Sequence, residues 1–420
     1  MRVVVIGAGL QGVASAWFLA SRGCEVTVLE RGGAVACATS YANAGMLTPS
    51  MADPWNAPGV LGHVLRWLGR EDAPFLLRLR ALPSIFGWGL SFLRNAQPAR
   101  FRANLEKNLR LASYSLNVLR ELRSTLHLCY DERSNGTLKV FRGARAFAEA
   151  VQRNALLSSL GLDVRALDAA QATRIEPALA PVRDKLVGGI YCPQDESGDA
   201  RAFTEALAHK ATEAGATFVF DAPVDFLDRS GQVILAAVSR RGVYGADTFV
   251  LAAGSWSQDL LRSLHFDLSV RPVKGYSITV PFGDWASPPR MPVIDDALHA
   301  AATPLGQRLR VAGTAELAGD DTALTPSRID NLFGLLLNLF PGYAPYLDRL
   351  HAAPWAGLRP VSADGVPLIG RYRCQNLFLN TGHGHLGWTL AAGSAKLLAD
   401  LMLGAVPEID ARPYDAQRRV

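Results

Sequence analysis

A glycine triplet directly after the first apolar run constrains the fold of this chain more than any other feature. The run Val3 to Ile6 is β-branched and apolar, which is typical of a buried parallel strand. It is followed at once by Gly7-Ala8-Gly9-Leu10-Gln11-Gly12, then by a helical period to about Arg22 and an expected strand from Glu25 to Glu30. Strand, G-x-G-x-x-G turn, helix and strand together predict a dinucleotide-binding β-α-β unit.

Each residue of this unit has a physical role in the prediction. Gly7 permits the tight turn, Gly9 lets the backbone approach a pyrophosphate, and Gly12 lets helix and strand pack closely. The helix N-terminus offers free N–H groups to the phosphates. Glu30, with Arg31 after it, ends the second strand, where a carboxylate accepts hydrogen bonds from an adenosine ribose. A bare glycine motif also occurs in unrelated turns, but the whole context favours a dinucleotide site.

The following segment, residues 38–45, contains small and hydroxyl residues with no helix or strand period. Such a loop suits a cofactor that extends past the first unit, although a plain surface loop has the same composition. These residues alone do not decide between FAD and NAD. The candidate cofactor-binding residues here are Thr39, Ser40, Asn43, Ala44 and Gly45.

Residues 59–95 are apolar with interspersed arginines, and two interpretations stay open. Such a segment can lie on a membrane surface. It can also form a pair of helices packed on a sheet, which we favour because Pro74 and Pro83 interrupt any long amphipathic helix. No run in the chain reaches the roughly 18 apolar residues that a spanning helix needs, so any membrane contact is expected to be peripheral.

Further along, Asp199 precedes a helix expected from about Ala202 to Ala214 and is interpreted as its N-cap rather than as a catalyst. Thr217 to Phe220 are expected as another strand at the cofactor sheet, and Val224 after them is a candidate cofactor-binding residue. The strand that ends in Ala253 and Gly254 has small residues at its carboxyl end, which permits close approach of a ligand or simply dense core packing.

Near the C-terminus, Arg359 lies in a stiff segment bounded by Gly357 and Pro360. Its planar guanidinium suits a substrate carboxylate, and a structural pairing with a neighbouring acid is the alternative. A second strand, glycine loop and helix follow, and the helix N-terminus there can stabilise negative charge on a reduced flavin. Its candidate residues are Gly382, Gly384, Leu386, Gly387, Trp388 and Thr389. The loop's two histidines, without clustered carboxylates, do not predict a metal site.

Length and composition limit the remaining classes. A chain of 420 residues is long enough for two cores. A formal net charge of +5 over 43 basic and 38 acidic residues gives little support to nucleic-acid binding. The five cysteines are scattered without a Cys-x-x-Cys, which favours a reducing compartment. We expect a cytoplasmic protein, with any membrane contact on the inner face, because the first strand begins directly after Met1 and Arg2.

The chain resembles the D-amino acid dehydrogenase small-subunit family, within the D-amino acid oxidase-like flavoproteins. The resemblance runs nearly end to end and rests on Gly7 to Gly12, Thr39 to Gly45, Pro272 to Ser277, Gly357 to Pro360 and Asn380 to Thr389. It implies a mixed α/β and α+β fold, with a Rossmann-like FAD-binding domain and an antiparallel-sheet substrate domain. The expected division assigns residues 1–50, 143–178, 194–267 and 354–420 to the first domain, and 51–142, 179–193 and 268–353 to the second.

The resemblance also implies an activity. FAD held non-covalently would oxidise a D-amino acid to an imino acid, which hydrolyses to the 2-oxo acid and ammonia, and the electrons would pass to an acceptor other than oxygen, such as quinone or a partner redox subunit. By similarity, Arg359 binds the substrate carboxylate and Tyr276 forms a wall of the pocket. His385 stands where many members carry a smaller residue, which implies an altered pocket. A D-proline or D-hydroxyproline dehydrogenase subunit of a larger complex and a non-catalytic flavin subunit are the alternatives.

Overall fold

The first residues form the expected β-α-β unit in the computed structural model, which describes every residue except Leu68 and Asp72. Strand β1 (Arg2–Ile6) leads into helix α1 (Leu10–Ala20) and returns in β2 (Glu25–Leu29), which pairs with β1 in parallel. The other strands of this sheet are β9 (Thr217–Val219), β13 (Thr248–Leu251), β19 (Leu368–Arg371) and β20 (Leu377–Thr381). Their order is β19-β20-β13-β1-β2-β9, and β13 lies directly beside β1.

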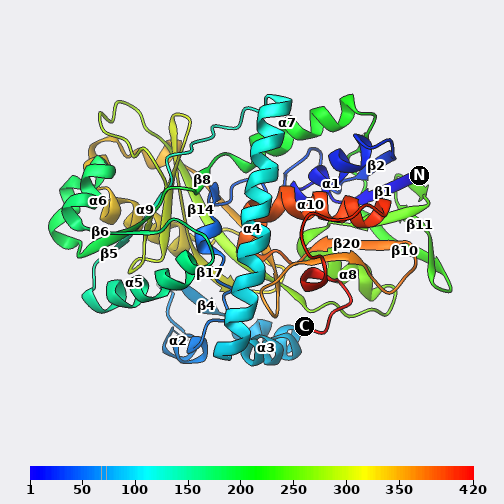
Figure 1. The fold of residues 1–420 in the computed structure, drawn as a ribbon, viewed down its shortest axis with the longest axis horizontal. Coiled ribbons are helices and arrows are strands. Elements are labelled where there is room, and N and C mark those ends of the chain that lie inside the picture. The colour runs from blue at the N-terminus through cyan, green and yellow to red at the C-terminus, as the bar shows by residue number, and fades with distance from the viewer. Residues whose placement is uncertain (68, 72) are drawn as a thin grey trace.

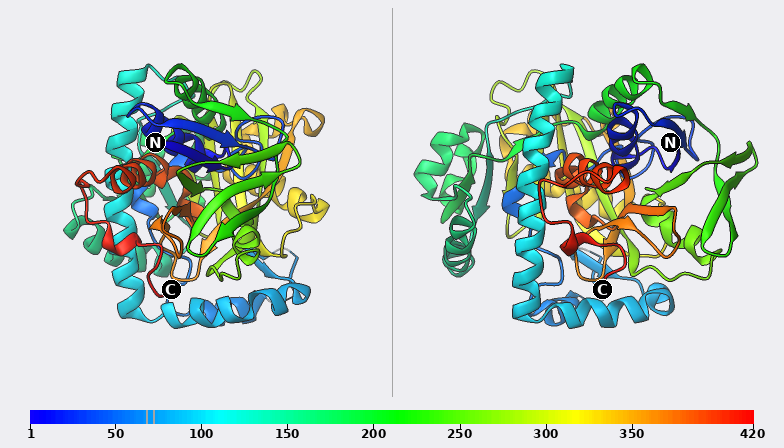
Figure 2. Two further views of the ribbon diagram at one scale, coloured as in Figure 1. Left: turned by 90° about the vertical axis from the view of Figure 1, so that its right-hand side faces the viewer. Right: turned by 45° about the vertical axis from the view of Figure 1, so that its right-hand side comes forward.

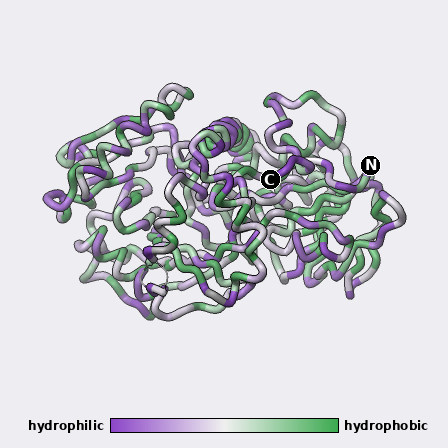
Figure 3. Tube along the Cα trace, turned by 90° about the horizontal axis from the view of Figure 1, so that it is seen from below, coloured by the Kyte–Doolittle hydropathy of each residue, from purple (hydrophilic) through white to green (hydrophobic). Residues whose placement is uncertain are grey.

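Both faces of this sheet are covered. On one face α1 packs against α7 (Ala200–Glu213) and α10 (Gly387–Leu403), and their apolar side chains form one buried cluster. On the other face lie α8 (Ser257–Arg262) and a small antiparallel sheet of β10 (Val224–Ser230), β11 (Val233–Ser239) and β12 (Gly242–Gly245). Hydrophobic stretches run through the interior of both halves of the molecule (Figure 3). This layered, largely parallel sheet is the arrangement that buries near-continuous apolar strands.

A second, mostly antiparallel sheet occupies the other half (Figure 1). Its order is β18 (Ala353–Ser362), β14 (Val270–Pro281), β17 (Arg308–Leu317), β16 (Ala300–Leu305), β15 (Val293–Asp295), β5 (Thr137–Phe141), β7 (Gly188–Cys192) and β6 (Arg165–Asp168), with β4 (Phe75–Leu77) beside β17. Helix α9 (Pro326–Leu339) packs on β14, β16 and β17 and closes a separate apolar core. Helices α5 (Ala144–Ser159) and α6 (Ala169–Ile175) flank β5 and β7.

Strand pairing corrects the expected domain division in two places. Residues 143–178 were expected in the dinucleotide-binding domain, but β6 pairs with β7 and so belongs to the second sheet. Residues 354–362 were expected there as well, but β18 pairs with β14 along its whole length. Within these segments β6 and β18 each look like ordinary strands, and only the register of non-local pairs assigns a strand to a sheet.

The long helix α4 (Pro98–Leu126) crosses the junction between the two halves and packs on α10 (Figure 2). The contact is close because Gly393 of α10 has no side chain: a Cβ there would lie 2.7 Å from the Cα of Ser115, whose hydroxyl accepts the Gly393 N–H at 3.0 Å. Short strands β3 (Met46–Leu47) and β8 (Glu196–Ser197) pair beneath α10.

The apolar and arginine-rich segment forms two short helices. They are α2 (Val60–Trp67) and α3 (Leu82–Asn95), and they lie at the end of the molecule where α4 begins (Figure 2). Pro83 stands in the first turn of α3, where a missing N–H costs nothing, and Ile85 and Trp88 pack into the protein. The expected packing is therefore confirmed for one face of α3. Among the described residues, no helix is both long and apolar enough to span a bilayer.

The interpretation of Asp199 is also confirmed. Its carboxylate accepts hydrogen bonds from the backbone N–H groups of Arg201 at 2.9 Å and Ala202 at 3.3 Å, which is the geometry of an N-cap for α7.

Candidate active site

A cavity of about 1120 Å³ lies between the two sheets. It is lined by the carboxyl ends of β1, β2 and β13, by the glycine loop before α10, and by the faces of β14, β16 and β17. This is the crevice at the carboxyl ends of parallel strands in which dinucleotides bind. Nearly all the residues singled out in the sequence line it: Gly7, Gly9, Glu30, Arg31, Thr39, Ser40, Asn43, Ala44, Gly45, Val224, Ala253, Gly254, Arg359, Gly384, His385, Leu386, Gly387, Trp388 and Thr389.

The structure gives two glycines of the first motif, Gly7 and Gly12, a steric reason. Gly7 has a φ of 103°, which disfavours residues with a side chain. A Cβ on Gly12 would lie 1.8 Å from the carbonyl oxygen of Gly7, so only glycine lets α1 start against β1. Gly12 therefore acts by packing and does not line the cavity. The first turn of α1 contains no acidic residue, which leaves its N–H groups suited to phosphate oxygens.

Glu30 is buried at the end of β2, with only 8% of its surface exposed. Backbone N–H groups hold its carboxylate in place. One carboxylate oxygen accepts the N–H of Ala8 at 2.7 Å and the other accepts the N–H of Gly32 at 2.8 Å. A carboxylate has about four acceptor positions, so both oxygens can still accept a ribose hydroxyl. The Glu30 carboxylate is therefore positioned to bind an adenosine ribose, as the motif predicts.

We expect Glu30→Ala to weaken FAD binding by about 1–3 kcal/mol, the scale of losing a hydrogen bond to a charged group. The dissociation constant, measured by flavin fluorescence on titrating the apoprotein, should rise accordingly. Glu25→Ala is the matched control, because Glu25 begins the same strand and is exposed. An unchanged FAD affinity in Glu30→Ala would remove this residue from the cofactor site.

The C-terminal glycine loop faces the first motif. Gln11 of α1 donates its side-chain amide to the carbonyl of Gly387 at 2.9 Å, which ties the two loops together. Helix α10 begins at Gly387, and its first turn has no acidic residue and receives no side-chain cap from the described residues, which suits a negatively charged ligand. The Trp388 side chain packs in the core, and its indole N–H donates to the carbonyl of Gly198. Gly382, at φ 80°, shapes the turn but lies outside the lining.

Arg359 extends from β18 into the middle of this cavity. Its guanidinium lies over Gly275 of the neighbouring strand, where a Cβ would be 2.0 Å from Nη1. Nη1 is buried, and among the described residues it has no hydrogen-bond partner. Burial lowers the pKa of the guanidinium to about 10, so it still carries its charge at neutral pH. A buried cation with an unused donor needs an anionic partner, and the cavity is where that partner can enter.

Two aromatic residues flank the guanidinium. The Arg359 guanidinium lies 5.4 Å from the centre of the Trp55 ring, and His385 stacks on the same tryptophan with centroids 5.0 Å apart and planes at 10°. Burial, and then the charge of Arg359, lower the pKa of His385 to about 4. Burial lowers the pKa of His383 to about 3, and its Nε2 lies 3.0 Å from the Ser394 hydroxyl. Both rings are neutral at physiological pH, so they shape the site and are poorly suited to accept a proton there.

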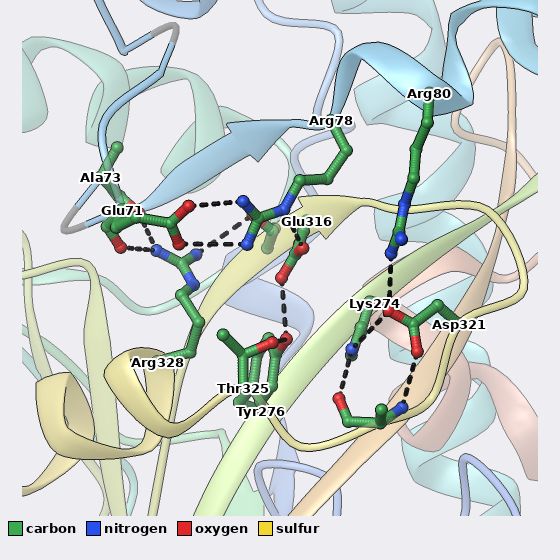
Figure 4. Close-up of polar contacts among 12 residues, drawn as sticks. Glu71, Ala73, Arg78, Arg80, Lys274, Tyr276, Glu316, Asp321, Thr325 and Arg328 are labelled. Carbon is green, nitrogen blue, oxygen red and sulfur yellow. Dashed lines mark hydrogen bonds and ion pairs between the residues drawn. The ribbon is translucent and has the colours of Figure 1, made fainter.

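Tyr276 lies outside the lining of the cavity. Its side chain is 1% exposed in the core beneath α9, and its hydroxyl donates to Glu316 at 2.8 Å and lies 3.0 Å from the Thr325 hydroxyl. Figure 4 shows this network, in which Glu316 also binds Arg78, which directly follows β4 and precedes α3. We therefore do not retain Tyr276 as a wall of the pocket. Since successive residues of a strand face opposite sides, Gly275 beneath Arg359 directs Tyr276 into the core.

Several lining residues carried no recognisable signal in the sequence. Trp55 and Asp53 come from a loop between the 3-10 turn Pro49–Met51 and α2, and nothing local marks them as part of the site. Thr314 is the extra residue in a β-bulge, between Gly313 opposite Tyr276 and Ala315 opposite Gly275. Its φ of 60° is rare for a β-branched residue and marks a strained position at the cavity. Such features follow from tertiary contacts alone.

Within the described part of the chain, His, Cys, Asp and Glu do not form a cluster that could hold a metal ion.

Comparison with known proteins agrees with this geometry. The family model described as FAD dependent oxidoreductase matches residues 2–401. The chain is 45% identical to a D-amino acid dehydrogenase of Paramagnetospirillum magneticum over 96% of this chain and 95% of that protein. It is 43% identical to a D-amino acid dehydrogenase of Azorhizobium caulinodans over the full length of both.

Solved structures show the same fold. A glycine oxidase from Geobacillus kaustophilus superposes with a TM-score of 0.77 at 23% identity, covering 100% of this chain and 99% of that one. An L-proline dehydrogenase from P. horikoshii gives 0.77 at 18% identity, covering 99% and 97%. The Gly7–Gly12 turn, the fixed carboxylate of Glu30 and the size of the cavity all fit FAD. The chain belongs to the family of FAD-dependent oxidoreductases.

Proposed function

We propose that this enzyme oxidises a D-amino acid to its imino acid, which hydrolyses to the 2-oxo acid and ammonia, and that its electrons pass to an acceptor other than oxygen. The guanidinium of Arg359 lines a cavity that fits FAD, and among the described residues its buried Nη1 has no hydrogen-bond partner; this is the observation that carries the proposal. The relatives named D-amino acid dehydrogenase support the substrate class. Bound FAD, held non-covalently, would supply the ring that accepts a hydride from the substrate α-carbon.

The residues of the chain bind and orient the substrate in this proposal. Arg359 holds the carboxylate, and its contact with the Trp55 ring helps to fix the position of the guanidinium. His385 forms the pocket wall behind Trp55. No side chain needs to remove a proton if the substrate arrives with a neutral amine. The first turn of α10 offers N–H groups at the cavity, where they can stabilise negative charge.

The direct test is anaerobic mixing of the yellow holoenzyme with matched D- and L-amino acids, including proline and hydroxyproline. We expect D-amino acids to bleach the flavin absorbance and their L-enantiomers to leave it unchanged. A protein that binds FAD and is bleached by none of them would contradict the proposal and identify a non-catalytic flavin subunit. Bleaching confined to the prolines would instead identify a D-proline or D-hydroxyproline dehydrogenase.

The pH dependence of kcat/KM should be bell-shaped. Activity rises with pH as the substrate amine loses its proton, and it falls again near pH 10, because deprotonation of Arg359 in the free enzyme removes the carboxylate anchor. His383 and His385 have pKa values of about 3 and about 4, so they contribute no limb between pH 5 and 9. Initial rates between pH 5 and 11 with two amino acids of different amine pKa measure both limbs. If the acidic limb lies at the same pH for both substrates despite their different amine pKa values, a base on the enzyme must be titrating instead.

We also propose that helix α3 contacts the surface of an anionic membrane, where a quinone acceptor would be available. One side of α3 packs inward, while Phe86 is 68% and Leu90 is 57% exposed at a spacing of one helical turn. Arg94 follows on the same helix and Arg100 lies in the first turn of α4, and both are exposed. Apolar side chains flanked by arginines suit the boundary between acyl chains and anionic headgroups.

The double variant Phe86→Glu, Leu90→Glu should lose binding to anionic vesicles. Two apolar side chains that no longer enter the lipid remove about 3 kcal/mol or more, which is at least 100-fold in the partition coefficient. Co-sedimentation with vesicles that contain phosphatidylglycerol measures this. Leu350→Glu is the matched control, because Leu350 is 93% exposed on a different element. Wild-type protein that stays in the supernatant would refute the contact.

A further inference from the structure

The cavity extends well beyond the reach of a substrate bound at Arg359. It follows the second sheet from Arg359 on β18 to Lys139 on β5, roughly 24 Å at about 4.8 Å for each step between neighbouring strands. At the far end its lining includes Glu149 and Arg153 of α5, which are exposed on the surface. The cavity therefore opens to solvent beside α5, and a substrate passes along the sheet to reach Arg359.

The charged residues at this opening are largely neutralised by one another. Lys139 forms an ion pair with Asp296 at 2.7 Å, and Glu149 accepts a hydrogen bond from Arg145 at 2.9 Å. Asp53 differs from them. Apart from its own backbone N–H, its carboxylate has neither a hydrogen bond nor an ion pair among the residues that the structure describes.

Asp53 lines the same cavity as the anchor and the opening. It is two residues from Trp55, whose ring lies against Arg359, and the charges of Lys139 and Arg153 at the opening act on its carboxylate. Asp53 lines the cavity and has accessible surface. The surrounding protein raises the carboxyl pKa above its ordinary value, because burial disfavours the charged form. An unpaired carboxylate on the lining attracts cations and repels anions that enter the cavity.

We infer that Asp53 is a specificity-determining residue that selects substrates by the charge of their side chain, favouring cationic D-amino acids and disfavouring acidic ones. The inference rests on the proposed function, because it requires a substrate whose carboxylate is held by Arg359 and whose side chain extends along the cavity. Asp53 takes no part in the chemical step. Its effect belongs to substrate binding and so to KM rather than to kcat.

The test is Asp53→Asn in the holoenzyme, with kcat and KM measured for D-lysine, D-methionine and D-glutamate. These substrates have side chains of similar length and charges of +1, 0 and −1. Removal of the charge should lower kcat/KM for D-lysine and raise it for D-glutamate, each on the order of 10-fold relative to D-methionine, with the change in KM. Glu149→Gln, which removes a paired carboxylate at the opening, should leave the three ratios as they are in wild type.

The outcomes separate the two proposals. Wild-type enzyme that oxidises none of these D-amino acids would remove the proposed function. Turnover with unchanged ratios in Asp53→Asn would overturn the role of Asp53 and leave the proposed function standing. An equal loss for all three substrates with a lower Tm would show that Asp53 is structural, which also overturns the inference. Asp53→Glu should retain the preference for D-lysine over D-glutamate, because it keeps the charge.

Discussion

Arg359→Lys is expected to keep its FAD and lose roughly 10- to 150-fold in kcat/KM, which corresponds to about 1.5–3 kcal/mol for one charge-assisted hydrogen bond. Lysine keeps the positive charge but has no planar fork with two parallel donors. It also loses the contact of the guanidinium with the Trp55 ring and its close fit over Gly275. Charge alone should therefore not restore activity.

The structure sharpens this expectation. A structural arginine would be paired with an acid, and its loss would leave a buried carboxylate alone and lower stability. Among the described residues no carboxylate binds Arg359, and its Nη1 has no partner at all. Steady-state kinetics, bound flavin per chain and Tm should be measured together. Normal turnover, or parallel loss of FAD, stability and activity, would show that Arg359 does not anchor the substrate.

Gly275→Ala tests the same carboxylate anchor while residue 359 remains an arginine. The new methyl group would lie 2.0 Å from Nη1 and 2.3 Å from Cζ of Arg359, so the guanidinium must leave its place. A loss of activity comparable to that of Arg359→Lys, with FAD retained, would show that the position of the charge matters and not only its presence.

Gly12→Ala is expected to have the largest effect on the cofactor and to abolish stable FAD binding. The added Cβ would lie 1.8 Å from the carbonyl oxygen and 2.9 Å from the carbonyl carbon of Gly7. Both are backbone atoms of the turn, and they cannot move aside as a flexible side chain would. Helix α1 must therefore shift away from β1, and the N–H groups that face the pyrophosphate shift with it.

The measurement is the flavin content of the purified variant and its recovery on addition of FAD. Gly334→Ala is the matched control, because Gly334 lies in α9 and a Cβ there meets nothing within 4 Å. That control should bind FAD fully and gain slightly in stability, since alanine is the better helix former. A Gly12→Ala protein that purifies with a full complement of FAD would show that the close helix–strand contact is not required.

Much of the cofactor half could be predicted because its requirements are local. A turn that needs a positive φ, a helix that starts against a strand and an N-cap aspartate each depend on residues close together in the chain. Gly7, Gly12 and Asp199 therefore carried their roles in the sequence, and the structure confirms them. The assignment of segments to sheets was less successful, because β6 and β18 pair with strands that no local pattern names.

By itself, the sequence determined where the backbone must turn, which strand precedes each glycine loop and which residue types stand there, because sterics and hydrogen bonding act over a few residues. Only the tertiary structure decided what surrounds Arg359. The register of β14 with β18 places Gly275 beneath the guanidinium and turns Tyr276 into the core. Trp55 and Asp53 reach the site from a loop about 300 residues away in the chain. Such contacts arise from the packing of separate sheets. A local sequence pattern specifies neither the strand register nor the long-range distances that bring these residues together.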